Sequence, residues 1–186
     1  MKKNKYNILI IILLSTFCSA FTLLPVWKEY KSYQGKFSIS LPDGDFTEKI
    51  IPIKTALGDL EQHTFYFTPV RLDAENKFYQ VTYIDYPEGT FHQDSTELRD
   101  LFYETSIDGA AQSVNGKVMY SENVALDGAK GKIWRIDYNK GNSIMKSKAF
   151  LIGNRFYTIS VATQKARIRN LDMLKYLDSF KYLSKL

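Results

Sequence analysis

The amino-acid sequence predicts an α+β fold, in which a mainly antiparallel sheet carries helices packed on it. Residues 131–163 alternate apolar and polar side chains with a period of two, which is the pattern of β-strands. Two other stretches, one after Asp94 and one after Asn170, repeat apolar side chains at helical spacing. The connections between most predicted strands are too short for parallel crossovers, so we expect neighbouring strands to run antiparallel.

Residues 131–163 predict three consecutive strands. Gly153 and Asn154 form a two-residue hairpin loop, because a glycine there supplies the positive φ that such a turn needs. A looser turn at residues 139–142 joins the other two strands. The first strand is expected to point Trp134, Ile136 and Tyr138 toward a helix layer, and Ile133, Arg135 and Asp137 toward a less apolar face.

Five further strands are expected, over residues 36–42, 49–55, 61–68, 77–86 and 117–125. Pro52 cannot donate a backbone hydrogen bond, so its strand is expected at a sheet edge or at a bulge. The strand 77–86 carries bulky side chains on both faces, and we expect it near the middle of the sheet, covered on both sides. Residues 25–33 are interpreted as a lead-in to the first strand.

Two helices complete the expected domain. Asp94 can cap the first helix, and Glu97 three residues later completes a capping box. The apolar stripe of this helix is predicted at Leu98, Leu101, Phe102, Thr105, Ala110, Ala111 and Val114. The pair Asn115-Gly116 ends the helix. The second helix begins at Asn170, and its predicted inward residues are Leu171, Leu174, Leu177 and Phe180.

The N-terminus has the pattern of a secretory signal. Three lysines precede the apolar run ILIIILL, and small residues before position 21 suit cleavage after Ala20. Residues 1–20 are therefore interpreted as a signal peptide. Because the apolar stretch continues to Trp27, about the length that spans a bilayer, an uncleaved membrane anchor is the alternative. In either case the protein is expected to be exported, and to be periplasmic or extracellular.

Charge and cysteine content limit the function. The formal net charge is +5, and cleavage after Ala20 would remove three lysines and no acid, which leaves +2. A nucleic-acid partner is therefore not expected, and the membrane is expected to be contacted only through an uncleaved N-terminal segment. Cys18 is the only cysteine and lies inside the signal, so disulfides and zinc-cysteine sites are not expected in the mature chain.

Four motifs resemble the PsbP-like superfamily in their order along the chain. They are FSISLP, YIDYPEG, the paired stretch GKIWRIDY and FLIGNRFYTISVAT, and LDSF near the end. The resemblance covers about residues 33–182 and is greatest to exported bacterial members of unknown function. It implies a single domain over residues 33–186, built as an α/β/α sandwich with a central antiparallel sheet. The superfamily carries no shared catalytic signature, and its characterised members are accessory, adaptor, chaperone-like or ligand-binding proteins.

No catalytic constellation is found in the sequence. Nucleophile elbows, HExxH helices, phosphate-binding loops and paired histidines are absent, so we expect no enzyme activity, no cofactor and no metal. His63 is expected to be a packed strand residue, and the alternative is a base in an aromatic cleft. Arg135 and Asp137 are expected to form a partly buried ion pair, and the alternative is that Arg135 and Arg155 together bind an anion.

The basic connector Lys165, Arg167 and Arg169 precedes the second helix. It is interpreted as a solvated loop, with anionic lipid or an acidic partner as the alternative. The sequence thus predicts an exported, non-catalytic binding or accessory protein of the cell envelope, with an envelope protein or a small apolar ligand as its partner. The alternative is an enzyme that uses His63 or a carboxylate. The residues Arg135, Asp137, Arg155 and His63 are the predicted ligand-binding candidates.

Overall fold

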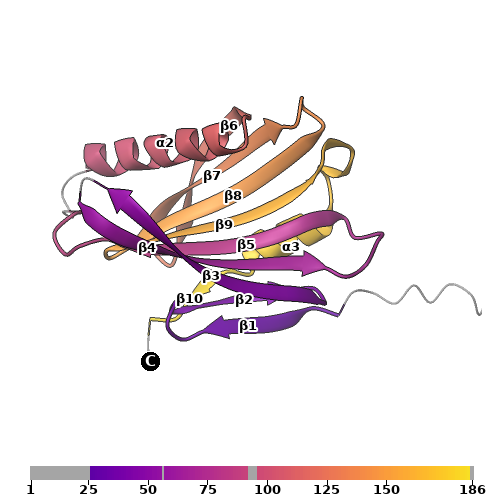
Figure 1. The fold of residues 1–186 in the computed structure, drawn as a ribbon, viewed down its shortest axis with the longest axis horizontal. Helices are drawn as coiled ribbons and strands as arrows, with labels where there is room; N and C mark the ends of the chain where they lie inside the picture. The colour runs from indigo at the N-terminus through magenta and orange to yellow at the C-terminus, as the bar shows by residue number, and fades with distance from the viewer. Residues whose placement is uncertain (1–25, 56, 92–95, 185–186) are drawn as a thin grey trace, which may run out of the picture.

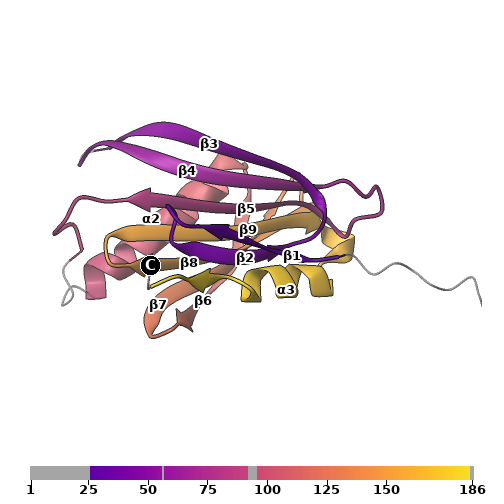
Figure 2. The same ribbon diagram turned by 90° about the horizontal axis from the view of Figure 1, so that it is seen from below.

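A computed structural model describes residues 26–55, 57–91 and 96–184. The predicted signal peptide and the predicted cap at Asp94 lie outside these residues. Within them, no helix combines the length and the apolar character that crossing a bilayer requires. The described residues contain two antiparallel sheets and two α-helices, as Figures 1 and 2 show.

The larger sheet has seven strands in the order β3-β4-β5-β9-β8-β7-β6, and every neighbouring pair is antiparallel. Its strands are β3 (Gly44–Thr55), β4 (Gly58–Pro69), β5 (Asn76–Asp85), β6 (Lys117–Leu126), β7 (Ala129–Tyr138), β8 (Ser143–Ile152) and β9 (Arg155–Gln164). The predicted antiparallel sheet is confirmed. Pro52 lies on the edge strand β3, and Gly153 takes the positive φ of 60° that the predicted hairpin requires.

A second, three-stranded sheet is the main difference from the prediction. It has the order β1-β2-β10 and consists of β1 (Lys28–Ser32), β2 (Phe37–Leu41) and β10 (Lys181–Tyr182). The interpretation of residues 25–33 as a lead-in is therefore wrong over β1, and β10 was not predicted. Strand β1 is mostly exposed, and its side chains do not alternate between apolar and polar. Backbone pairing with β2, and not burial, therefore holds it in place.

Two layers cover the larger sheet (Figure 2). Helix α2 (Thr96–Ser113) lies on one face, and Trp134 and Ile136 pack with it in one core, as predicted. The second sheet and α3 (Leu171–Asp178) lie on the other face, which forms a second core rich in aromatic rings. A short 3-10 helix, η1 (Lys165–Arg167), leads into α3. The α+β class and the layered sandwich are thus as predicted.

The inward stripe of α2 is confirmed in part, since Phe102, Ala110, Ala111 and Val114 pack in the core as predicted. Leu98, Leu101 and Thr105 are exposed instead, and Tyr103 and Ile107 are buried. The Tyr103 hydroxyl fixes this orientation, since it donates to the Lys130 carbonyl at 3.0 Å and accepts from the Leu151 amide at 2.8 Å. An aromatic side chain with hydrogen-bond partners on the sheet therefore outweighs two leucines.

Helix α3 is also rotated from its prediction. The Asn170 side chain caps it by accepting from the Met173 amide at 2.7 Å. Leu177 and Phe180 are buried as predicted, but Leu171 and Leu174 are exposed, and Met173 and Tyr176 are buried in their place. The Tyr176 hydroxyl donates to the Gln80 carbonyl at 2.8 Å, and its ring lies 4.8 Å from that of Tyr79. These contacts with β5 turn the two leucines outward.

Candidate functional site

The four predicted ligand-binding residues lie in two separate places. Arg135 is paired across the sheet with Lys146, which is paired in turn with Val161 on β9. Arg155 lies six residues before Val161 on β9, a distance of about 20 Å along the strand. Arg135 and Arg155 therefore do not meet, and the alternative of one anion site built from both is wrong.

Arg135 and Asp137 form the ion pair expected from their spacing on one strand face. The guanidinium donates to both carboxylate oxygens, with Nε–Oδ1 and Nη2–Oδ2 distances of 2.7 and 2.8 Å. The side chain of Asp137 is only 7% exposed, and that of Arg135 is 18% exposed. The Lys165 ammonium of η1 lies 3.2 Å from the same carboxylate. Burial alone would raise the pKa of Asp137, but the bonds from Arg135 and Lys165 hold this pKa below its ordinary value.

Further basic side chains lie beside this pair on β8. Lys146 is directly opposite Arg135, so both side chains project from the same sheet face. Lys148 projects from that face two residues later, and its ammonium lies 2.6 Å from the Asp178 carboxylate of α3. Four bases and two acids thus gather over β7, β8, η1 and α3. The edge strand β6 adds Lys117 opposite Asp137 and Glu122 opposite Ile133. The charges of Lys117 and Glu122 cancel, so β6 does not change the local net charge.

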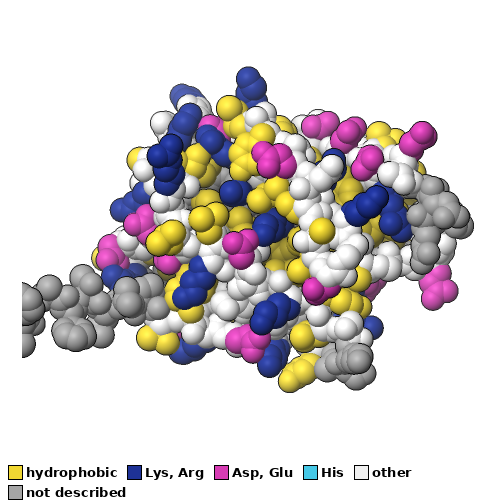
Figure 3. Space-filling model, turned by 180° about the vertical axis from the view of Figure 1, so that it is seen from behind, with side chains coloured by type: hydrophobic (Ala, Val, Ile, Leu, Met, Phe, Trp, Pro, Cys, Tyr) yellow, Lys and Arg dark blue, Asp and Glu magenta, His cyan; other side chains and the backbone are white. Residues whose placement is uncertain are grey.

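Helix α3 forms the apolar side of this region. Leu174 lies one turn before Asp178, so it is on the side of α3 that faces β8, and it remains 47% exposed. Figure 3 shows this side of the molecule, where hydrophobic and basic side chains lie together in a hollow between α3 and the strands near β6. We call the set Arg135, Asp137, Lys146, Lys148, Lys165 and Leu174 the basic groove.

Lys146, Lys148 and Leu174 were not predicted as site residues. The sequence would have allowed the two lysines to be predicted, because residues 146 and 148 are two positions apart and therefore lie on one face of a strand. The turn at 139–142 would also have set the pairing of Arg135 with Lys146, since it joins Tyr138 to Ser143. Leu174 could not be found in this way, because its exposure depends on how α3 packs.

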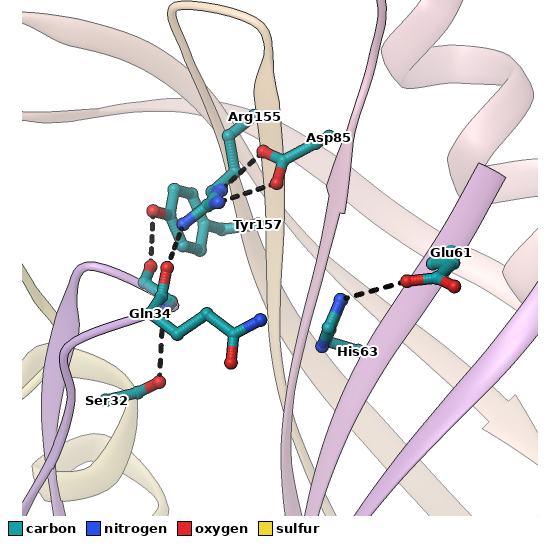
Figure 4. A network of polar contacts seen from close by, with 8 residues as sticks. Ser32, Gln34, Glu61, His63, Asp85, Arg155 and Tyr157 are labelled. Carbon is teal, nitrogen blue, oxygen red and sulfur yellow. Dashed lines mark hydrogen bonds and ion pairs between the residues drawn. The ribbon is translucent and has the colours of Figure 1, made fainter.

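Arg155 belongs to a different network, drawn in Figure 4. Its Nη2 donates to the Asp85 carboxylate at 2.6 Å, and its Nη1 donates to the Gln34 carbonyl at 2.8 Å. Its guanidinium carbon also lies 4.3 Å from the centre of the Tyr83 ring. Burial would lower the pKa of Arg155, but the bonds to Asp85 raise this pKa above its ordinary value.

The same network holds the β1–β2 loop against the end of the large sheet. The Tyr157 hydroxyl donates to the Gly35 carbonyl at 2.7 Å, and the Gly35 amide donates to the Ser32 hydroxyl at 3.0 Å. Burial raises the pKa of Tyr157 above its ordinary value. Because Arg155 already binds a carboxylate, a carbonyl and a ring, this arrangement joins the two sheets rather than offering a free cation.

His63 is packed in the strand layer. Its ring is parallel to that of Tyr83 within 7°, with centroids 4.4 Å apart, and its Nε2 lies 3.8 Å from the Glu61 carboxylate. In the described part of the chain, its Nδ1 and the Tyr83 hydroxyl are buried and have no hydrogen-bond partner. Burial raises the pKa of Tyr83 to about 12. Among the described residues, no group of three or more potential metal ligands occurs.

Comparisons with known proteins support the fold. No protein-family description matches the sequence, and no curated protein matches it either. Among solved structures, the chain is similar to the solution structure of cyanobacterial PsbP (CyanoP) from Synechocystis sp. PCC 6803, with a TM-score of 0.55 and 15% sequence identity. The match covers 89% of this chain and 96% of that one. The class defined by these findings is an α+β protein with a PsbP-like fold, and at this identity the likeness extends to the fold alone.

Proposed function

We propose that this protein is an exported, non-catalytic binding or accessory protein of the cell envelope, which holds an acidic segment of a partner protein in its basic groove. The observation that carries the proposal is a local excess of positive charge, because Lys146 lies directly opposite Arg135, whose carboxylate partner Asp137 is shared with Lys165. Like charges directly opposite each other destabilise a sheet. An acidic partner placed over them would offset that repulsion, and the exposed Leu174 would contact an apolar side chain of the same segment.

A protein partner is favoured over a small apolar ligand. An apolar cavity between the two sheets, lined by rings such as Phe37, Phe65 and Tyr79, has a volume of about 10 Å³. This is about the room that one water molecule needs, whereas ligand pockets usually measure roughly 300–1,000 Å³. The aromatic side chains therefore fill the space that an enclosed apolar ligand would occupy.

The geometry gives little support to the alternative of an enzyme based on His63. A general base must reach the proton that it abstracts. The Nδ1 atom of His63 is buried, and its Nε2 atom faces the exposed Glu61. The ring is held flat against Tyr83, which is typical of a packed aromatic pair.

Export is supported by the signal pattern of the N-terminus. N-terminal sequencing of the mature protein would distinguish cleavage after Ala20 from retention of residues 1–20.

Affinity capture with charge-reversed variants tests the proposed function. Tagged wild-type protein, Lys146→Glu and Lys132→Glu would be recovered from envelopes, and bound proteins identified by mass spectrometry. Lys132 is a matched control, because it is half-buried on the same strand as Arg135 but on the opposite face. We expect a partner with an acidic segment that binds wild type and Lys132→Glu but not Lys146→Glu. Equal recovery by all three proteins would contradict the proposal.

A further inference from the structure

One end of the molecule exposes apolar side chains from three segments. These segments are the residues just before β1, the β4–β5 loop and the start of α3, and they lie together in Figures 1 and 2. Val26 and Val70 expose 65% and 57% of their surface, Leu171 exposes 80%, and Leu72 is fully exposed. We call Val26, Val70, Leu72 and Leu171 the apolar end. Clustered exposure of this kind marks an interaction surface rather than scattered surface residues.

Hydrogen bonds join the segments that carry the apolar end. The Arg167 guanidinium of η1 donates to the Asp73 and Ala74 carbonyls of the β4–β5 loop at 3.1 and 2.8 Å. The side-chain amides of Asn76 and Asn170 bind each other reciprocally, both at 3.1 Å, which joins β5 to the cap of α3. Hydrogen bonds between the segments therefore fix the backbone that carries the exposed apolar side chains.

Trp27, just before β1, packs against β5 and α3 at the same end of the molecule. The ring of Trp27 meets that of Tyr79 edge-on, with centroids 6.1 Å apart. The Lys175 ammonium of α3 lies 4.4 Å from the centre of the same indole ring. Tryptophan next to lysine is typical of the interface between a bilayer and water, where the ring enters the headgroup region and the ammonium meets phosphate.

The charge at this end is slightly positive. Segments 26–28, 70–77 and 167–172 contain five basic residues, Lys28, Arg71, Lys77, Arg167 and Arg169, and three acidic residues, Asp73, Glu75 and Asp172. Two of these bases are in ion pairs, Lys28 with Asp43 at 3.3 Å and Arg71 with Asp73 at 2.7 Å. Arg169 is exposed on this end. Basic side chains at the rim of an exposed apolar patch favour a membrane carrying anionic headgroups.

The sequence before Val26 favours a lipid bilayer as the partner of the apolar end. The apolar run of residues 8–24 directly precedes the apolar end, and its last part, FTLL at 21–24, stays attached even if cleavage follows Ala20. We propose that the apolar end lies against the surface of a lipid bilayer, with Leu72 and Leu171 in its headgroup region. This surface shares no residue with the basic groove, so the proposal does not depend on the proposed function.

Site-specific fluorescence in vesicles tests this proposal. The full chain would carry Cys18→Ser and one new cysteine, Leu72→Cys or Leu101→Cys, labelled with a polarity-sensitive nitrobenzoxadiazole dye. Leu101 is the matched control, because it is also an exposed leucine but lies on α2. Each protein would be reconstituted in vesicles of phosphatidylcholine and phosphatidylglycerol in equal parts, with a spin label near the lipid headgroup as quencher.

The label at position 72 is expected to emit at shorter wavelength and to be quenched several-fold more than the label at position 101. A label at Leu171→Cys should behave like that at position 72, which provides a second readout if one variant folds poorly. The proposal would be overturned if the labels at 72 and 171 were as water-exposed as the label at 101, or if all three were quenched to the same extent.

Discussion

Arg135 on β7 lies directly opposite Lys146 on β8, and both side chains project from the sheet face that carries α3. Asp137 neutralises Arg135 through two hydrogen bonds and also binds Lys165. One carboxylate therefore serves two cations, and Lys146 adds a third positive charge beside them. A sheet built for stability alone would place an acidic or apolar side chain at position 146, so the local charge excess indicates a binding surface.

Reversing the charge at position 146 is expected to stabilise the fold while it removes partner binding. Lys146→Glu replaces a like-charge pair with an opposite-charge pair, so the free energy of unfolding should rise by up to about 1 kcal/mol. Urea denaturation measures this change, with Lys132→Glu as the control. A loss of stability in Lys146→Glu would mean that Lys146 supports the fold and would remove this argument for a binding surface.

Asp137 is expected to contribute stability that depends on pH. Its pKa is lowered in the folded protein, so its contribution is present above the unfolded pKa of about 3.9 and is lost as the pH falls through the lower folded value. Asp137→Asn should lower the free energy of unfolding at pH 7 by about 2 kcal/mol, because Arg135 and Lys165 lose their partner.

The exposed acid Asp178 provides the control for this experiment. Its side chain is 66% exposed in the pair with Lys148, so Asp178→Asn should cost less than about 1 kcal/mol. Urea titrations of the three proteins from pH 7 down to pH 2 would show a steep loss of stability for wild type and a shallower one for Asp137→Asn. Parallel curves for wild type and Asp137→Asn would contradict the assigned ion pair.

Arg155 is expected to hold the β1–β2 loop. Arg155→Ala removes the bonds to Asp85 and Gln34 and the contact with Tyr83, so the unfolding free energy should fall by roughly 2–3 kcal/mol. Hydrogen exchange at residues 33–36 should become faster. Tyr157→Phe is a milder control that removes one hydrogen bond, at a cost of about 1 kcal/mol. If Arg155→Ala retained its stability but lost partner binding, Arg155 would belong to a binding site instead.

His63 is expected to act through its ring and not through its nitrogens. His63→Phe keeps the stacking on Tyr83 and removes a buried polar atom, so stability should be unchanged or rise by about 1 kcal/mol. His63→Ala should lose about 2–3 kcal/mol, because it leaves a cavity beside Tyr83. Thermal and urea denaturation give these values. Loss of partner capture in a fully folded His63→Phe variant would assign a binding role to the imidazole.

Local pattern was sufficient to predict most of the large sheet but not the second layer. The alternation around Trp134 and the turn at Gly153 determine the β7–β9 meander, because each depends on residues close together in the chain. Strand β1 is polar and β10 has two residues, and both form only because β2 pairs with them. The helix faces were predicted only in part, because exposed leucines of both helices were assigned to the core. Tyr103 and Tyr176 decide the orientation through hydrogen bonds to distant carbonyls.

The candidate site was also predicted only where it depends on residues close together in the sequence. Arg135 and Asp137 are two residues apart on one strand, so their pairing could be read from spacing alone. The separation of Arg135 from Arg155 requires the strand register, and the exposure of Leu174 requires the packing of α3. Interactions between elements that are distant in the sequence therefore account for what the pattern did not predict.

Photocrosslinking from the basic groove tests the central claim most directly. A photoreactive benzoylphenylalanine would replace Lys146, or Lys132 on the opposite face, in the full chain expressed in its own cell. We predict that the probe at position 146 crosslinks to one envelope protein, at a peptide rich in Asp and Glu, and that the probe at position 132 does not. The absence of such a crosslink from position 146, or the same crosslinked peptide from both positions, would contradict the account.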